Sequence, residues 1–146
     1  MARYADTVPS VRSQADTFDY LARFSNTAEW DPGAVAGRDH TDGGEVGVGS
    51  RFSLDFKMAG REQELEYEVV EYERPNRIRL VCHKQAFTSD DTIVVEPDGR
   101  GARVTYDAVV DLRGPLRVFD PLLKLGFKRA GSQAAAGLER TLSRSA

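Results

Sequence analysis

From Arg51 to Leu112, the chain consists of successive runs in which apolar and polar residues alternate. In the first run Phe52, Leu54 and Phe56 alternate with charged or hydroxyl side chains, which is the pattern of a strand with one face in the core and the other in water. The connections between runs are short, so neighbouring strands should be antiparallel. Such a sheet has a single apolar face to bury, and this requirement constrains the rest of the fold.

The second run, residues 61–73, carries glutamates on one face and large apolar side chains on the other. The alternation slips at Val69 and Val70, which predicts a β-bulge and a bend in the sheet. After the proline turn that follows, we expect Tyr72 to pair with Leu80 on the next strand.

The last two runs flank the glycine-rich turn at residues 97–101. If Val95 opposes Val104 across this turn, then Asp91 opposes Ala108 on the apolar face. Desolvation there would raise the pKa of the carboxyl toward the range of a general acid or base. The alternative is that the strand frays or slips in register and exposes this side chain to water.

Three more polar residues share the inward phase of Asp91. Ser89 lies two residues before it on the same face, and Tyr67 and Tyr106 point inward by the same alternation. In a pocket the tyrosines would orient a carbonyl or phenol, or protonate an enolate. Asp91, Tyr67 and Tyr106 are therefore the candidate catalytic residues. The structural alternative is that the tyrosines are core residues with satisfied hydroxyl groups.

The longest helix is expected from residue 121 to residue 143 and is the main cover available for the sheet. Its apolar stripe is bulky at first, with Leu123 and Phe127, and becomes small further on, with Ala130 and Ala134. A helix with so little bulk on its buried face either lies very close to the sheet or leaves a cavity beneath it.

Composition excludes several functional classes. A chain of 146 residues fits one domain, residues 1–146. Its 20 basic and 23 acidic residues predict no nucleic-acid partner. We expect no integral membrane contact, because the sequence has neither an apolar run of spanning length nor the pattern of a signal peptide. The single cysteine, Cys82, predicts a cytoplasmic protein without disulfides. His40 and His83 lack convergent partners, so no metal or other cofactor is expected. We expect a monomer or homodimer.

Four features of the sequence occur together. They are the corner Asn26…Glu29-Trp30-Asp31-Pro32, the strand start Gly47–Phe52, the strand and turn Tyr67–Pro75, and the closing long helix. Together they resemble the START-like, or SRPBCC, helix-grip superfamily, which includes polyketide cyclases/dehydrases and proteins of the birch-pollen-allergen type. The resemblance implies an α+β helix-grip fold. Its curved antiparallel sheet of six to seven strands would wrap around a long C-terminal helix, with two short N-terminal helices and a hydrophobic pocket.

The pocket implied by this resemblance lies between the sheet and the terminal helix. Its expected lining is Trp30, Phe52, Leu54, Phe56, Tyr67, Leu80, Ser89, Asp91, Ile93, Tyr106, Ala108, Leu123, Phe127, Ala130 and Ala134. The first hypothesis is binding of a small hydrophobic molecule, such as a polyketide, lipid, quinone or other aromatic. One alternative is an enzyme of the polyketide cyclase or aromatase type that uses the pocket acids and phenols. A second is a protein-interaction module of the chaperone-activator type, which a filled interior would favour.

Overall fold

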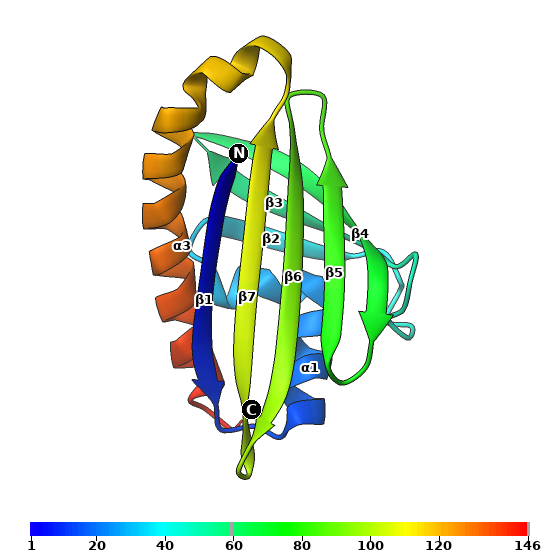
Figure 1. Cartoon of the computed structure of the whole chain (residues 1–146). Helices are drawn as coiled ribbons and strands as arrows, with labels where there is room; N and C mark the ends of the chain where they lie inside the picture. The colour runs from blue at the N-terminus through cyan, green and yellow to red at the C-terminus, as the bar shows by residue number, and fades with distance from the viewer. Residues whose placement is uncertain (59, 146) are drawn as a thin grey trace.

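In the part of the chain that the computed structural model describes, residues 1–58 and 60–145, seven strands form one antiparallel sheet. Their order is β1-β7-β6-β5-β4-β3-β2, so the first strand pairs with the last (Figure 1). The strands are β1 (Ala2–Ser10), β2 (Ala34–Asp39), β3 (Arg51–Met58), β4 (Arg61–Glu73), β5 (Arg77–His83), β6 (Phe87–Asp98) and β7 (Gly101–Leu112).

Three short helical segments follow β1, and a 3-10 helix and one long helix follow β7. They are α1 (Gln14–Ala22), the 3-10 turn η1 (Phe24–Asn26), α2 (Thr27–Trp30), the 3-10 helix η2 (Gly114–Phe119) and α3 (Asp120–Leu142). Ser13 caps α1, because its Oγ accepts a hydrogen bond from the backbone N–H of Asp16 at 3.1 Å. The long helix α3 runs along the sheet beside β1, and α1 packs on β6 (Figure 1). The predicted fold class is confirmed.

The register of the sheet agrees with the sequence prediction at one hairpin and differs at another. The bulge predicted in β4 is present directly after Val69. The predicted pairing of Tyr72 with Leu80 is wrong, since Tyr72 pairs with Ile78 and Leu80 pairs with Val69. The turn at residues 74–76 is tight and β5 begins immediately after it, which moves the pairing by two residues.

At the hairpin of β6 and β7 the predicted register is confirmed. Val95 pairs with Val104, and Asp91 pairs with Ala108. Because β6 extends continuously from Phe87 to Asp98, Asp91 lies in the interior of a strand and not at a frayed end.

The small residues of α3 have two different consequences along its length. A Cβ atom at Gly131 would lie 2.4 Å from the ring of Tyr4 in β1, and one at Gly137 would lie 2.0 Å from the carbonyl oxygen of Trp30. The C-terminal half of α3 therefore approaches β1 and α2 more closely than any other residue type permits. At Gly126 a Cβ would meet no heavy atom of the described residues within 4 Å. The helix thus fits tightly at its end and leaves space near its start.

None of the helices in the described part of the chain combines the length and the hydropathy that a transmembrane span requires.

Candidate functional site

A cavity of about 680 Å³ lies between the inner face of the sheet and α3. Its walls come from β1, β3, β4, β6, β7, the corner that joins α2 to β2, and one face of α3. A volume of this size is typical of sites for small molecules, and most of the lining side chains are apolar. The interior is therefore not filled.

Most of the residues expected in the pocket do line this cavity. They are Trp30, Phe56, Tyr67, Ser89, Asp91, Tyr106, Ala108, Leu123, Phe127, Ala130 and Ala134.

Four expected lining residues lie elsewhere. Phe52, Leu54, Leu80 and Ile93 face inward as predicted, but they are fully buried in the packed core and have no surface on the cavity. They pack in one cluster with side chains of α1 and η1, such as Phe18. These short helices cover their part of the sheet, whereas α3 covers the rest loosely.

Four polar side chains form a connected cluster on the cavity wall, which we call the polar chain. The hydroxyl of Tyr106 donates a short hydrogen bond to Oδ2 of Asp91, and Oγ of Ser89 donates to Oδ1 at 3.3 Å. The hydroxyl of Tyr67 lies 2.9 Å from Oγ of Ser89. The polar chain therefore spans β4, β6 and β7, and its central carboxyl is 6% exposed.

Burial shifts the acid–base properties of the polar chain. Loss of solvation raises the pKa of Asp91 to about 7, and the charges of Asp90 and Asp31 act in the same direction. The hydrogen bonds from Tyr106 and Ser89 favour the carboxylate and oppose this rise in pKa. Near neutral pH the central carboxyl is thus poised either to donate or to accept a proton.

The two tyrosines remain protonated in the same range. Burial, together with the nearby charge of Asp91, raises the pKa of both Tyr67 and Tyr106 well above the ordinary value. Their rings are held by edge contacts with Phe24 at 4.9 Å and Trp30 at 5.6 Å between ring centroids. Both hydroxyls are therefore fixed hydrogen-bonding groups at the polar chain.

A second carboxyl of the cavity wall, Asp31, was not identified from the sequence. Its Oδ1 accepts a hydrogen bond from the backbone N–H of Gly33 at 2.9 Å, and burial raises its pKa. The sequence marked this segment as a corner but did not indicate that the corner faces the cavity. The available signal was its position next to Trp30, which we had expected in the pocket wall.

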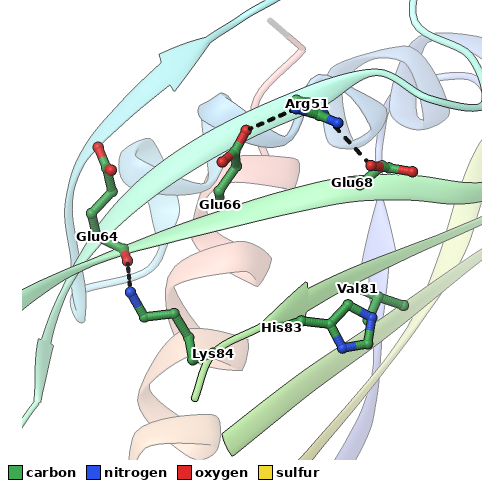
Figure 2. A pocket seen from close by; sticks show the side chains of 7 residues that line it. All are labelled: Arg51, Glu64, Glu66, Glu68, Val81, His83 and Lys84. Atoms are coloured by element: carbon green, nitrogen blue, oxygen red, sulfur yellow. Dashed lines mark hydrogen bonds and ion pairs between the residues drawn. The ribbon is translucent and has the colours of Figure 1, made fainter. Parts of the chain in front are cut away.

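A second hollow of about 380 Å³ lies on the outer face of the sheet (Figure 2). Its charged side chains are paired across the strands. Arg51 lies 3.9 Å from Glu66 and 3.5 Å from Glu68, and Nζ of Lys84 donates to the carbonyl oxygen of Glu64 at 3.0 Å. The two contacts of Arg51 are exposed ion pairs, which contribute little to stability, and the contact of Lys84 is a hydrogen bond to the backbone of the same solvated sheet face.

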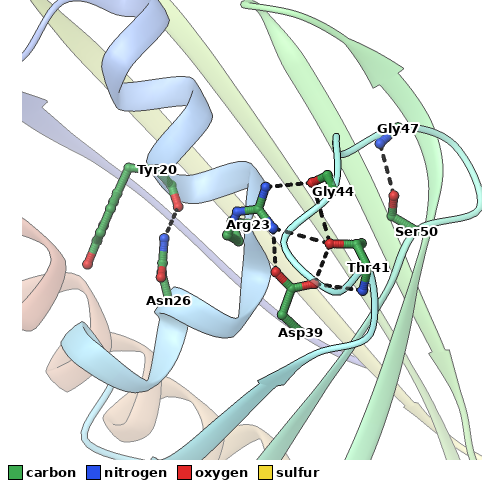
Figure 3. A network of polar contacts seen from close by, with 8 residues as sticks. All are labelled: Tyr20, Arg23, Asn26, Asp39, Thr41, Gly44, Gly47 and Ser50. Carbon is green, nitrogen blue, oxygen red and sulfur yellow. Dashed lines mark hydrogen bonds and ion pairs between the residues drawn. The ribbon is translucent and has the colours of Figure 1, made fainter.

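Arg23 lies at the centre of a polar network at the C-terminal end of β2 (Figure 3). Its guanidinium forms an ion pair with Asp39 and donates to the carbonyl oxygen of Gly44 at 2.8 Å. Oδ1 of Asp39 in turn accepts the backbone N–H of Thr41 at 2.8 Å. The network ties the glycine-rich loop after β2 to the end of α1, which is a structural role.

The histidines do not gather ligands. Nε2 of His40 lies 2.7 Å from Oγ of Ser53, and His83 is exposed. Within residues 1–58 and 60–145, no group of three or more His, Cys, Asp or Glu side chains is placed to hold a metal ion.

A family model described as "Polyketide cyclase / dehydrase and lipid transport" matches residues 1–143. No curated protein sequence gave a significant match.

Several solved structures share the fold. A START superfamily protein from Mycobacterium smegmatis is 17% identical with a TM-score of 0.76, and the alignment covers 97% of each chain. TTHA0849 from Thermus thermophilus is 16% identical with a TM-score of 0.74, over 97% of this chain and 95% of that one. Major latex-like protein 151 from Panax ginseng is 16% identical with a TM-score of 0.56, over 90% and 97%. At these identities the likeness concerns the fold alone.

Proposed function

The chain belongs to the polyketide cyclase/dehydrase and lipid-transport family, and from that premise we propose that it binds one small hydrophobic molecule in the cavity under α3. The observation that carries the proposal is a largely apolar cavity of about 680 Å³ with a single buried polar cluster on its wall. Family and fold are consistent with hydrophobic ligand binding. Burial of about 200 Å² of apolar ligand surface would contribute about 5 kcal/mol.

The polar chain defines the ligand further. A neutral oxygen, such as a hydroxyl, a phenol or a carbonyl, can exchange hydrogen bonds with Asp91 and Tyr106. An anionic ligand group would meet two carboxyls, the buried Asp91 and the half-buried Asp31, whereas Lys57, the basic side chain among the described lining residues, is exposed. We therefore favour a polyketide, quinone or other neutral aromatic over a free fatty acid.

Three matched probes test this preference: 2-naphthol, naphthalene and 2-naphthoate. Calorimetric titration at pH 8, which lies above the pKa of Asp91 and still leaves 2-naphthol neutral, is expected to rank the neutral hydroxyl compound first and the carboxylate last. Failure of both neutral probes to bind at concentrations up to their solubility limits would contradict the proposal, and tighter binding of the carboxylate would contradict the ligand class.

A variant that narrows the cavity tests the location. Ala134→Leu adds bulk to the lining and is expected to weaken binding of 2-naphthol about tenfold, since losing about 55 Å² of apolar contact, at about 25 cal/mol per Å², costs about 1.4 kcal/mol. Ala136→Leu makes the same change on the exposed face of α3 and is the control. Equal affinities of the two variants would place the ligand elsewhere.

A second candidate function is proton-transfer catalysis of the polyketide cyclase type. It is favoured by one observation, the contact of the phenol of Tyr106 with a buried carboxyl whose pKa is about 7. The carboxylate of Asp91 would take a proton from the methylene between two ketone groups, while a tyrosine hydroxyl hydrogen-bonds the enolate oxygen.

Deuterium exchange separates the enzyme from the binding module. The methylene protons of nonane-2,4-dione in D₂O are followed by NMR with the wild-type chain and with Asp91→Asn. Exchange faster than buffer that is lost in the variant supports catalysis. Exchange no faster than buffer excludes this chemistry and leaves the binding function in place.

A further inference from the structure

Large apolar side chains are exposed on η2 and on the first turns of α3. Val118, Phe119, Leu122 and Leu125 are 74%, 51%, 69% and 75% exposed. Single exposed apolar residues are common, but four within eight positions form a contiguous patch that is typical of an interaction surface.

The same segment is strongly basic. Residues 113–129 contain five basic side chains and one acidic side chain, for a formal charge of +4, although the whole chain carries −3. The basic residues are Arg113, Arg117, Lys124, Lys128 and Arg129. The acidic one, Asp120, already holds the N-terminal ammonium of Met1 at 2.8 Å. The average charge of the chain therefore conceals a positive segment.

On α3, apolar and basic groups share the outer face. Leu125 precedes Lys128 by three positions and Arg129 by four, so these side chains are neighbours on the helix surface. Leu123 and Phe127 are turned toward the cavity instead. The start of the helix is thus apolar on both faces, with positive charge beside its outer face.

We propose that residues 113–129, which we call the amphipathic edge, dock peripherally on an anionic lipid bilayer. Apolar side chains enter the boundary between headgroups and acyl chains, while lysines and arginines at the same level contact lipid phosphates. A symmetric contact between two copies is disfavoured, because it would place one segment of charge +4 against another.

The amphipathic edge lies at the cavity. Leu122 and Gly126 line it and are also exposed, so the docked surface includes the cavity rim. On the premise of the proposed function, the bilayer is then the source or the destination of the hydrophobic ligand. Docking itself does not depend on that premise.

Vesicle flotation with the full chain tests the docking. We expect binding to vesicles of 70% phosphatidylcholine and 30% phosphatidylglycerol, weakened by salt, and little binding to phosphatidylcholine alone. Val118→Glu/Leu125→Glu and Lys124→Glu/Lys128→Glu are each expected to lower the partition coefficient at least about tenfold. Val118, Lys124, Leu125 and Lys128 do not line the cavity, so 2-naphthol binding is expected to be unchanged.

Matched controls change the same properties elsewhere. Val48→Glu alters another exposed valine. Arg100→Glu/Arg144→Glu reverses two exposed charges, one in the turn between β6 and β7 and one just after α3, and both segments lie at the opposite end of the molecule from the start of α3 (Figure 1). The controls and Ala134→Leu, which narrows the cavity, are expected to bind vesicles like the wild type. The proposal is overturned if the wild type binds neither vesicle, if it binds both equally, or if the controls lose as much binding as the edge variants. It is also overturned if sedimentation shows a dimer that Val118→Glu/Leu125→Glu dissociates and no vesicle binds.

Discussion

Replacing Asp91 by asparagine removes one ionisable proton from the cavity wall while keeping the size of the side chain and an oxygen that accepts from Tyr106. In the folded wild type this carboxyl has a pKa of about 7, raised from 3.8 mainly by burial. Between these two pH values the folded chain holds a proton at this position that the unfolded chain has released. The contribution of this carboxyl to the free energy of unfolding therefore falls as pH rises.

The size of this effect follows from the shift in pKa. Each pH unit in the window costs about 1.4 kcal/mol, and about three units give about 4 kcal/mol. The contribution is fully present below pH 4 and lost above pH 7. Asp91→Asn has no such loss, so its stability relative to the wild type is expected to rise across this window and then level off.

Urea unfolding at pH 5, 6, 7 and 8, followed by the fluorescence of Trp30, measures this difference. Carboxyls whose pKa values are lowered by arginine partners, such as Asp19 and Glu71, titrate in both proteins and cancel. Asp90→Asn removes the neighbouring outward carboxylate, which lies 2.7 Å from Arg79, and is expected to show a much smaller rise, because its charge is only a minor cause of the raised pKa of Asp91. A difference between Asp91→Asn and wild type that stays constant from pH 5 to 8 would refute the reasoning.

Two further predictions use single substitutions. Gly126→Ala is expected to stabilise the chain by roughly 0.5–1 kcal/mol through helix propensity, whereas Gly137→Ala is expected to destabilise it by about 2 kcal/mol, because its Cβ would lie 2.0 Å from the carbonyl oxygen of Trp30. Thermal melts check the pair, and equal effects would contradict the close approach. Tyr106→Phe removes a bond that favours the carboxylate, so the pKa of Asp91 is expected to rise further. The same urea series would then show the loss of stability extending to higher pH, and an unchanged profile would argue against that bond in solution.

The sequence pattern predicts which face of the sheet each strand residue lies on. Strict alternation fixes the face, and the turn at residues 97–101 fixes how β6 meets β7. For this reason the inward orientation of Asp91 and Tyr106 follows from pairing Val95 with Val104. For β4 and β5 the same reasoning gave a register that is wrong by two residues. The bulge adds a residue to β4 and the turn is tight, so the number of residues between paired positions differs from the expected one.

Position along the inner face was not predictable. Phe52 and Phe56 have the same phase in β3, yet the first is in the packed core and the second lines the cavity. The difference depends on where α1, η1 and α3 dock, and the period of a strand contains no information on docking. Asp31 was missed for the same reason, since a turn motif describes local backbone and not the space that it faces.

The glycines of α3 connect the fold to access to the cavity. Each glycine inside a helix costs about 1 kcal/mol relative to alanine. At Gly131 and Gly137 that cost is offset by packing, because both allow an approach that a Cβ would prevent. Gly126 permits no such contact and weakens the helix where it borders the cavity. Segments with few buried contacts open at the lowest free energy. The helix is therefore anchored at its C-terminal half and is most exposed at the amphipathic edge, so we expect hydrogen exchange of its backbone amides to be fastest there.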